Sequence, residues 1–62
     1  MNAKTIWTDE NGDHVVRTYY DETRNKFVTD YHVGDKEEAW TTSDDEEDAK
    51  WTHKRMVRRY FL

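Results

Sequence analysis

Apolar and polar residues alternate along the first two thirds of the chain, at the spacing of half-buried β-strands. Successive side chains of a strand point to opposite faces of a sheet, so this alternation marks strands with one buried face. Short segments with Gly, Asn or Asp, which favour turns, separate the apolar runs. The pattern predicts strands over residues 4–8, 14–20 and 27–33, and the charged segment 36–42 would add a fourth strand at an exposed edge.

The turns between the strands predict how the strands pair. Asn11–Gly12 is typical of a two-residue hairpin turn, which places Trp7 opposite Val16. A three-residue loop over residues 10–12 would place Ile6 there instead. With a four-residue loop over residues 22–25, the next hairpin pairs Tyr20 with Phe27, Thr18 with Thr29, Arg17 with Asp30 and Val16 with Tyr31.

This register sorts the side chains of the strands onto two faces. The face that we expect to be buried holds Val16, Tyr20, Phe27, Tyr31 and Val33, with Trp40 beside Thr29. One helix covers only one face of a sheet. We therefore expect an open sheet face with apolar residues available to a partner, namely Val15, Tyr19, Val28 and, with the three-residue loop, Trp7.

The last third of the chain changes to a helical period. Ala49, His53, Met56, Val57 and Tyr60 fall on one side of a helix over residues 44–60. The tetrapeptide from Ser43 to Glu46 has the form of a capping box, and acidic residues precede basic ones as the helix dipole favours. The predicted fold class is α+β, a three- or four-stranded antiparallel β-meander packed by one C-terminal α-helix.

Trp51 does not fit the buried side of this helix. It projects on the opposite side, together with Arg55, Arg58 and Leu62. An exposed Trp framed by Arg is the composition of a protein interface or of a surface on which bases stack. The alternative is a frayed or bent helix that folds Trp51 onto a neighbouring loop.

Composition limits the classes of protein to which the chain can belong. Its 62 residues amount to one small domain over residues 1–62, and the absence of Cys excludes disulfides and Cys-based zinc sites. Charged residues make up 39% of the chain and the net charge is −4, but 15% aromatic residues indicate a folded core. No run is apolar enough for a membrane span or a signal peptide, so we expect a cytoplasmic protein without membrane contact.

The chain offers few residues for catalysis or for binding a cofactor. Ser43 is the single Ser and caps the helix, and the two Gly residues lie in turns rather than in a phosphate-binding loop. The register places His14 and His32 on opposite faces, so the three His residues do not converge on a metal. We expect no enzyme, no cofactor and no metal site.

Three functions remain, all of them binding functions. The first is a protein-binding module, such as a phage- or prophage-type inhibitor or regulator of a host protein, which could also form a homodimer through the open sheet face. The second is an acidic mimic of DNA, presenting an acidic cluster made of Glu37, Glu38, Asp44, Asp45, Glu47 and Asp48. Nucleic-acid binding by the basic helix ranks third, because the net charge and the acidic start of the helix both repel phosphate.

Overall fold

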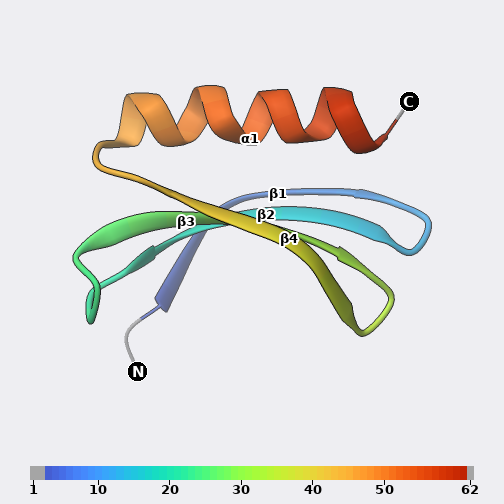
Figure 1. Cartoon of the computed structure of the whole chain (residues 1–62), viewed down its shortest axis with the longest axis horizontal. Coiled ribbons are helices and arrows are strands. Elements are labelled where there is room, and N and C mark those ends of the chain that lie inside the picture. The colour runs from blue at the N-terminus through green and yellow to red at the C-terminus, as the bar shows by residue number, and fades with distance from the viewer. Residues whose placement is uncertain (1–2, 62) are drawn as a thin grey trace.

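The computed structural model describes residues 3–61, and Leu62 lies outside this range. Within it, four antiparallel strands form one open sheet in the order β1-β2-β3-β4, and a single helix packs on one face (Figure 1). The elements are β1 (Ala3–Asn11), β2 (His14–Asp21), β3 (Lys26–Val33), β4 (Lys36–Ser43) and α1 (Glu46–Tyr60). The predicted α+β meander with a C-terminal helix is confirmed, and the charged segment does form a fourth strand.

The central hairpin has the predicted register. Residues 22–25 connect β2 to β3, and Asn25 adopts a φ of 58°, a left-handed conformation that Asn tolerates better than most residues. Thr18 pairs with Thr29 and Arg17 pairs with Asp30. The alternation of side chains on these two strands therefore follows the sequence pattern.

The two outer hairpins turn on Gly–Asp pairs. Asn11 pairs with His14 and Val33 pairs with Lys36, so two residues lie between the strands in each case. Gly12 has a φ of 64° at the first central position of its turn, where the type II′ geometry requires a positive φ. The predicted turn at Asn11–Gly12 is therefore wrong by one residue, because glycine occupies the first central position and Asn11 stays in the strand.

This shift also changes the predicted partners in β1. Trp7 pairs with Thr18, and Val16 pairs with Asp9, so neither of the two alternatives for the residue opposite Val16 holds. An irregularity between Thr5 and Trp7 then places an extra residue in β1. Trp7 lies before this irregularity, counted from the turn, and its pairing with Thr18 places it on the face that carries the helix.

A second irregularity displaces Trp40 from its expected place. The register of β3 and β4 shifts between His32 and Tyr31. His32 pairs with Glu37, whereas Tyr31 pairs with Ala39, so Glu38 is the extra residue in β4. The extra residue between them sends every later side chain of β4 to the opposite face. Trp40 thus pairs with Asp30 instead of Thr29 and is 51% exposed, contrary to the predicted core position.

The helix begins later than the sequence predicts. Asp45 is its N-cap, and the Asp45 side chain accepts a hydrogen bond from the Asp48 backbone N–H at 2.8 Å. Ser43, the predicted cap, still pairs with Phe27 in the sheet and is therefore extended. The chain leaves the sheet only after this pair. Asp45, two residues later, is therefore the residue whose side chain can cap the helix.

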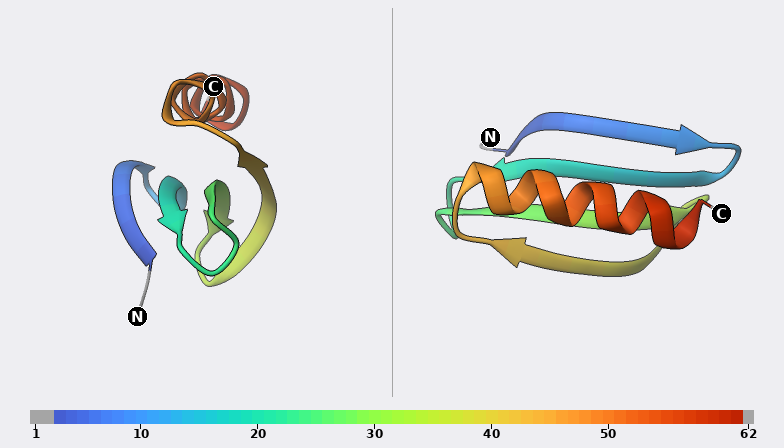
Figure 2. Two further views of the ribbon diagram at one scale, coloured as in Figure 1. Left: turned by 90° about the vertical axis from the view of Figure 1, so that its left-hand side faces the viewer. Right: turned by 90° about the horizontal axis from the view of Figure 1, so that it is seen from above.

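The core lies between α1 and the central strands, and Figure 2 shows the helix running over β2 and β3. Val16, Tyr31 and Ala49 of α1 are buried there, and the rings of Tyr31 and Tyr60 stack with their centroids 3.9 Å apart. The predicted buried side of the helix is confirmed. On its other side the sheet arches away from the helix and forms a concave surface (Figure 1).

Candidate functional site

The side of α1 turned away from the sheet is a basic surface with an aromatic centre. Trp51 is 60% exposed, which confirms the predicted orientation of its side chain and excludes the folded-over alternative. Lys54 Nζ lies 5.4 Å from the centroid of the indole ring, within the range of a cation–π contact. We call this surface the outer helix face; it consists of Trp51, Lys54, Arg55, Arg58 and Arg59.

The cations of the outer helix face are free of acidic partners. All of the Lys and Arg residues of α1 are exposed, and none of them forms an ion pair with another residue of the described range 3–61. The acidic residues of the helix are confined to its first turn, at Glu46, Glu47 and Asp48. Positive charge next to an exposed indole is thus available to a partner, and negative charge begins one turn away.

The concave sheet face, which consists of the side chains on the side of the sheet away from α1, is more polar than the sequence indicates. Arg17 Nη2 donates a hydrogen bond to Asp30 Oδ2 at 2.9 Å, and Asp30 is only 2% exposed. Beside this pair, a hollow of about 300 Å³ is lined by Tyr19, Arg24, Val28, Asp30, Glu37 and Trp40. The centre of this face is therefore a charged recess rather than an apolar patch.

Of the four residues that we expected on an open sheet face, three lie on the concave sheet face and Trp7 does not. Val28 is 1% exposed, buried at the base of the hollow among longer side chains. Trp7 lies on the opposite face, with its ring centroid 5.9 Å from that of His53. Val15 and Tyr19 do lie on the concave sheet face and are half-buried. The expected face is therefore right for Val15, Tyr19 and Val28, but Val28 is buried and Trp7 lies on the other side of the sheet.

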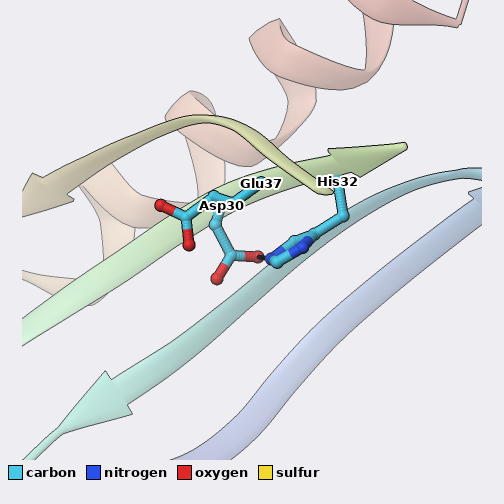
Figure 3. A group of neighbouring side chains, drawn as sticks. All are labelled: Asp30, His32 and Glu37. Atoms are coloured by element: carbon cyan, nitrogen blue, oxygen red, sulfur yellow. Dashed lines mark ion pairs between the residues drawn. The ribbon is translucent and has the colours of Figure 1, made fainter. Parts of the chain in front are cut away.

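Asp30, His32 and Glu37 come together on the concave sheet face (Figure 3). One ligand atom of each, a carboxylate oxygen or an imidazole nitrogen, lies within 4.8 Å of the others. His32 Nε2 is 3.5 Å from Asp30 Oδ1, close enough for an ion pair but too long for a good hydrogen bond. Both atoms are buried without a hydrogen-bond partner.

Sequence reasoning missed this cluster, although the signal is present. Asp30 and His32 are two residues apart in one strand and share a face, and a two-residue Gly–Asp turn places Glu37 opposite His32. The prediction from the sequence concerned only the meeting of the three His residues with one another. They do not meet: His14 Nδ1 contacts the Tyr31 hydroxyl at 2.7 Å on the helix side, while His32 lies on the concave sheet face.

His53 links the helix to the sheet through a chain of hydrogen bonds. Its Nε2 lies 2.7 Å from Asp9 Oδ2 and its Nδ1 lies 2.8 Å from Thr18 Oγ1, which in turn contacts Thr29 Oγ1 at 2.9 Å. A carboxylate can only accept, so the ring nitrogen that faces Asp9 carries the proton. The order of groups resembles a catalytic triad, but Thr18 is 0% exposed and no substrate can reach its hydroxyl. The chain of bonds supports packing.

The acidic cluster predicted from the sequence is split in two. Glu37 and Glu38 lie near the start of β4, and Asp44, Asp45, Glu47 and Asp48 lie around the start of α1. At the usual rise of a strand, the six residue-to-residue steps from Glu38 to Asp44 span roughly 20 Å. Lys26 bonds to Asp44 and Lys36 lies 3.8 Å from Glu38, so part of the charge is compensated. The hydrogen bond and charge of Lys26 hold the pKa of Asp44 below its usual value.

Comparisons of the chain with models of protein families, with curated proteins and with solved structures find no match. In the described part of the chain, α1 is neither long enough nor apolar enough to cross a bilayer. Evidence on function therefore comes from the surfaces themselves.

Proposed function

We propose that the chain is a non-enzymatic binding module that regulates or inhibits a cytoplasmic protein by docking its outer helix face. The observation that carries this proposal is the 60% exposure of Trp51 among cations that have no acidic partner within residues 3–61. Trp and Arg are the residue types most enriched at interface hot spots. The occupant that fits is an acidic protein surface with an apolar pocket for the indole ring.

A protein fits this surface better than a nucleic acid does. Glu46 and Glu47 lie next to Lys50 and Trp51, so the surface is mixed in charge at the start of the helix. A protein can offer complementary charges of both signs, whereas a phosphate backbone is negative throughout and is repelled by this turn. The net charge of −4 also repels a phosphate backbone.

Mimicry of DNA by the acidic residues has weaker support. The cluster is divided between the two ends of β4, and two of its members, Glu38 and Asp44, lie beside Lys residues. Only the exposed acidic residues around the start of α1 remain as one group. We keep this function as a second candidate because Asp45, Glu47 and Asp48 are exposed there.

Partner capture with matched variants tests the proposal. The tagged full chain is incubated with nuclease-treated lysate, alongside Trp51→Ala and Trp40→Ala, which truncate exposed Trp residues on opposite sides of the molecule. We expect one protein to be retained by the wild type and by Trp40→Ala but lost by Trp51→Ala. Its measured affinity should fall about 30-fold in Trp51→Ala, as expected for a hot spot of about 2 kcal/mol.

Two results would contradict the docking of the outer helix face. If both Trp variants lose the partner equally, Trp51 is not the specific contact that we propose. Retention in Trp51→Ala with release by salt would favour the acidic residues, because exposed charge interactions weaken as ionic strength rises.

Nucleic-acid binding is tested separately with a variant in which Trp51 is the only Trp. In Trp7→Phe/Trp40→Phe the fluorescence reports the outer helix face alone, since the chain has 3 Trp residues. We expect no change in emission when single-stranded DNA is added at low salt. Quenching that disappears at higher salt would show stacking on Trp51 with phosphate contacts and would replace the proposed protein partner.

A further inference from the structure

We propose that the concave sheet face holds a divalent transition-metal ion, with zinc as the best fit. Its ligands are Asp30 Oδ1, His32 Nε2 and the carboxylate of Glu37. This site lies on the opposite side of the sheet from the outer helix face and does not depend on the function proposed above.

The spacing of the ligand atoms fits coordination better than it fits direct contact. Ligand atoms bound about 2.1 Å from a tetrahedral ion lie roughly 3.4 Å from each other. Asp30 Oδ1 and His32 Nε2 are 3.5 Å apart, which is long for a hydrogen bond but matches this edge of a tetrahedron. Glu37 completes a group whose ligand atoms all lie within 4.8 Å of one another.

Burial supplies an independent argument for a ligand. Asp30 Oδ1 and His32 Nε2 are both inaccessible to solvent and both lack a hydrogen-bond partner. Leaving a buried polar group unsatisfied costs about 1–3 kcal/mol, and more when the group is charged. A metal ion between the two atoms would satisfy both, because an unprotonated imidazole nitrogen and a carboxylate oxygen each have a lone pair that can bind the ion.

The strands hold the ligands in place before an ion arrives. Arg17 Nη2 donates to Asp30 Oδ2 at 2.9 Å, which fixes the carboxylate and leaves its other oxygen directed to His32 (Figure 3). Bonds of this kind to the non-ligating atom commonly orient metal ligands. Glu37 faces His32 across the β3–β4 pair, and its exposed side chain can rotate to close the site.

The donor set selects the kind of ion. One imidazole nitrogen with two carboxylates suits zinc and its neighbours in the first transition series, whereas calcium and magnesium prefer oxygen ligands alone. With a neutral imidazole, two carboxylates and the Arg17 guanidinium leave one net negative charge at the site. The charge therefore favours a cation even with an Arg residue next to Asp30.

Three protein ligands leave one tetrahedral position open. Sites of this kind usually hold water or a donor from a bound molecule at the fourth position. Asp30 and Glu37 also line the hollow that contains Tyr19 and Trp40. An anionic or neutral donor that enters the hollow would therefore reach the ion from the solvent side.

Calorimetric titration of the full chain with zinc tests the site. The informative variant is Glu37→Gln, because Glu37 is exposed and its replacement does not disturb the core, whereas replacing buried Asp30 can unfold the domain. We expect saturable binding of one ion by the wild type, and an affinity more than about tenfold weaker in Glu37→Gln. The His32→Gln variant should lose binding, with folding checked by circular dichroism.

Two control variants distinguish this site from others. Glu38→Gln makes the same chemical change one residue away, and Asp9→Asn removes the carboxylate beside His53, the other His residue with a carboxylate neighbour. Both should bind zinc like the wild type. The proposal is overturned if the wild type shows no saturable binding at millimolar zinc, if Glu37→Gln and Glu38→Gln bind equally well, or if Asp9→Asn alone loses the ion.

Discussion

Tyr19 shows how the surroundings of one residue on the concave sheet face change its chemistry. Partial burial raises the pKa of its phenol above the usual value, and the negative charge of Asp30 raises it further. Arg17, whose guanidinium lies 4.9 Å from the centroid of the Tyr19 ring, acts in the opposite direction but does not cancel these effects. The folded state therefore disfavours the ionised form of Tyr19.

This shift predicts a loss of stability at alkaline pH. Because the pKa of Tyr19 is higher in the folded state, its contribution is complete below the unfolded value of about 10 and is lost as the pH rises through the folded value. Urea unfolding from about pH 8 to about pH 11 should show a smaller alkaline loss of free energy in Tyr19→Phe than in the wild type. An equal loss in both proteins would show that Tyr19 does not carry this dependence.

Residue environments on the concave sheet face could be predicted only in part from the sequence. The pairing of Arg17 with Asp30 follows from the loop length and the alternation of side chains, and it is confirmed. The burial of Val28 does not follow, because long side chains of the arched sheet cover it. A pattern of alternation gives the face of a residue but not the curvature of the sheet.

The residue at which α1 begins depends on where the preceding strand stops pairing in the sheet. Ser43 and Asp45 are both good N-cap residues in sequence terms, but Ser43 pairs with Phe27 and its Oγ lies 3.5 Å from Thr52 Oγ1, whereas the Asp45 side chain accepts from a backbone N–H of α1. The start of the helix is therefore decided by the length of β4.

Capping by Asp45 predicts a difference between two variants. Asp45→Ala removes the acceptor for the Asp48 N–H and a negative charge at the positive end of the helix, which should cost about 1 kcal/mol of stability. Ser43→Ala, the matched control, should change the free energy of unfolding by less than about 0.5 kcal/mol. Chemical denaturation of both measures this. A larger loss in Ser43→Ala would restore the capping box predicted from the sequence.

The elements were easier to predict than their pairing. Apolar periodicity and turn residues were enough for the four strands, the helix and the register of β2 with β3. Near Trp7 the register of β1 differs because the hairpin turns on Gly12–Asp13, whereas the register of β4 changes through an extra residue within the strand, which no turn signal announces. Trp40 was therefore assigned to the wrong face, the face of Trp7 depended on the choice between two turns, and Trp51 on the helix was assigned to the correct side.

The distribution of charge over the whole molecule bears on self-association. The concave sheet face carries Arg17, Asp30 and Glu37 around its hollow, and the outer helix face is basic, so two copies would bring like charges or polar groups together. Dimers usually bury a large apolar surface.

We therefore predict a monomer rather than the homodimer that an apolar sheet face would have favoured. Light scattering at micromolar concentrations should give the mass of one chain, 7.6 kDa. A doubled mass that returns to this value in Trp40→Ala would contradict the prediction and locate the contact on the concave sheet face. A doubled mass that returns in Trp51→Ala would locate it on the outer helix face.

The order of the strands in the sheet also has a kinetic consequence. Each strand lies beside the one that precedes it in the chain, and two-residue turns close the outer hairpins. Low contact order of this kind spares a folding chain the entropy of closing long loops before its core forms. Because the chain has no Pro, it also lacks the prolyl isomerisation that delays many refolding reactions by tens of seconds. The connectivity thus favours rapid refolding in a single phase.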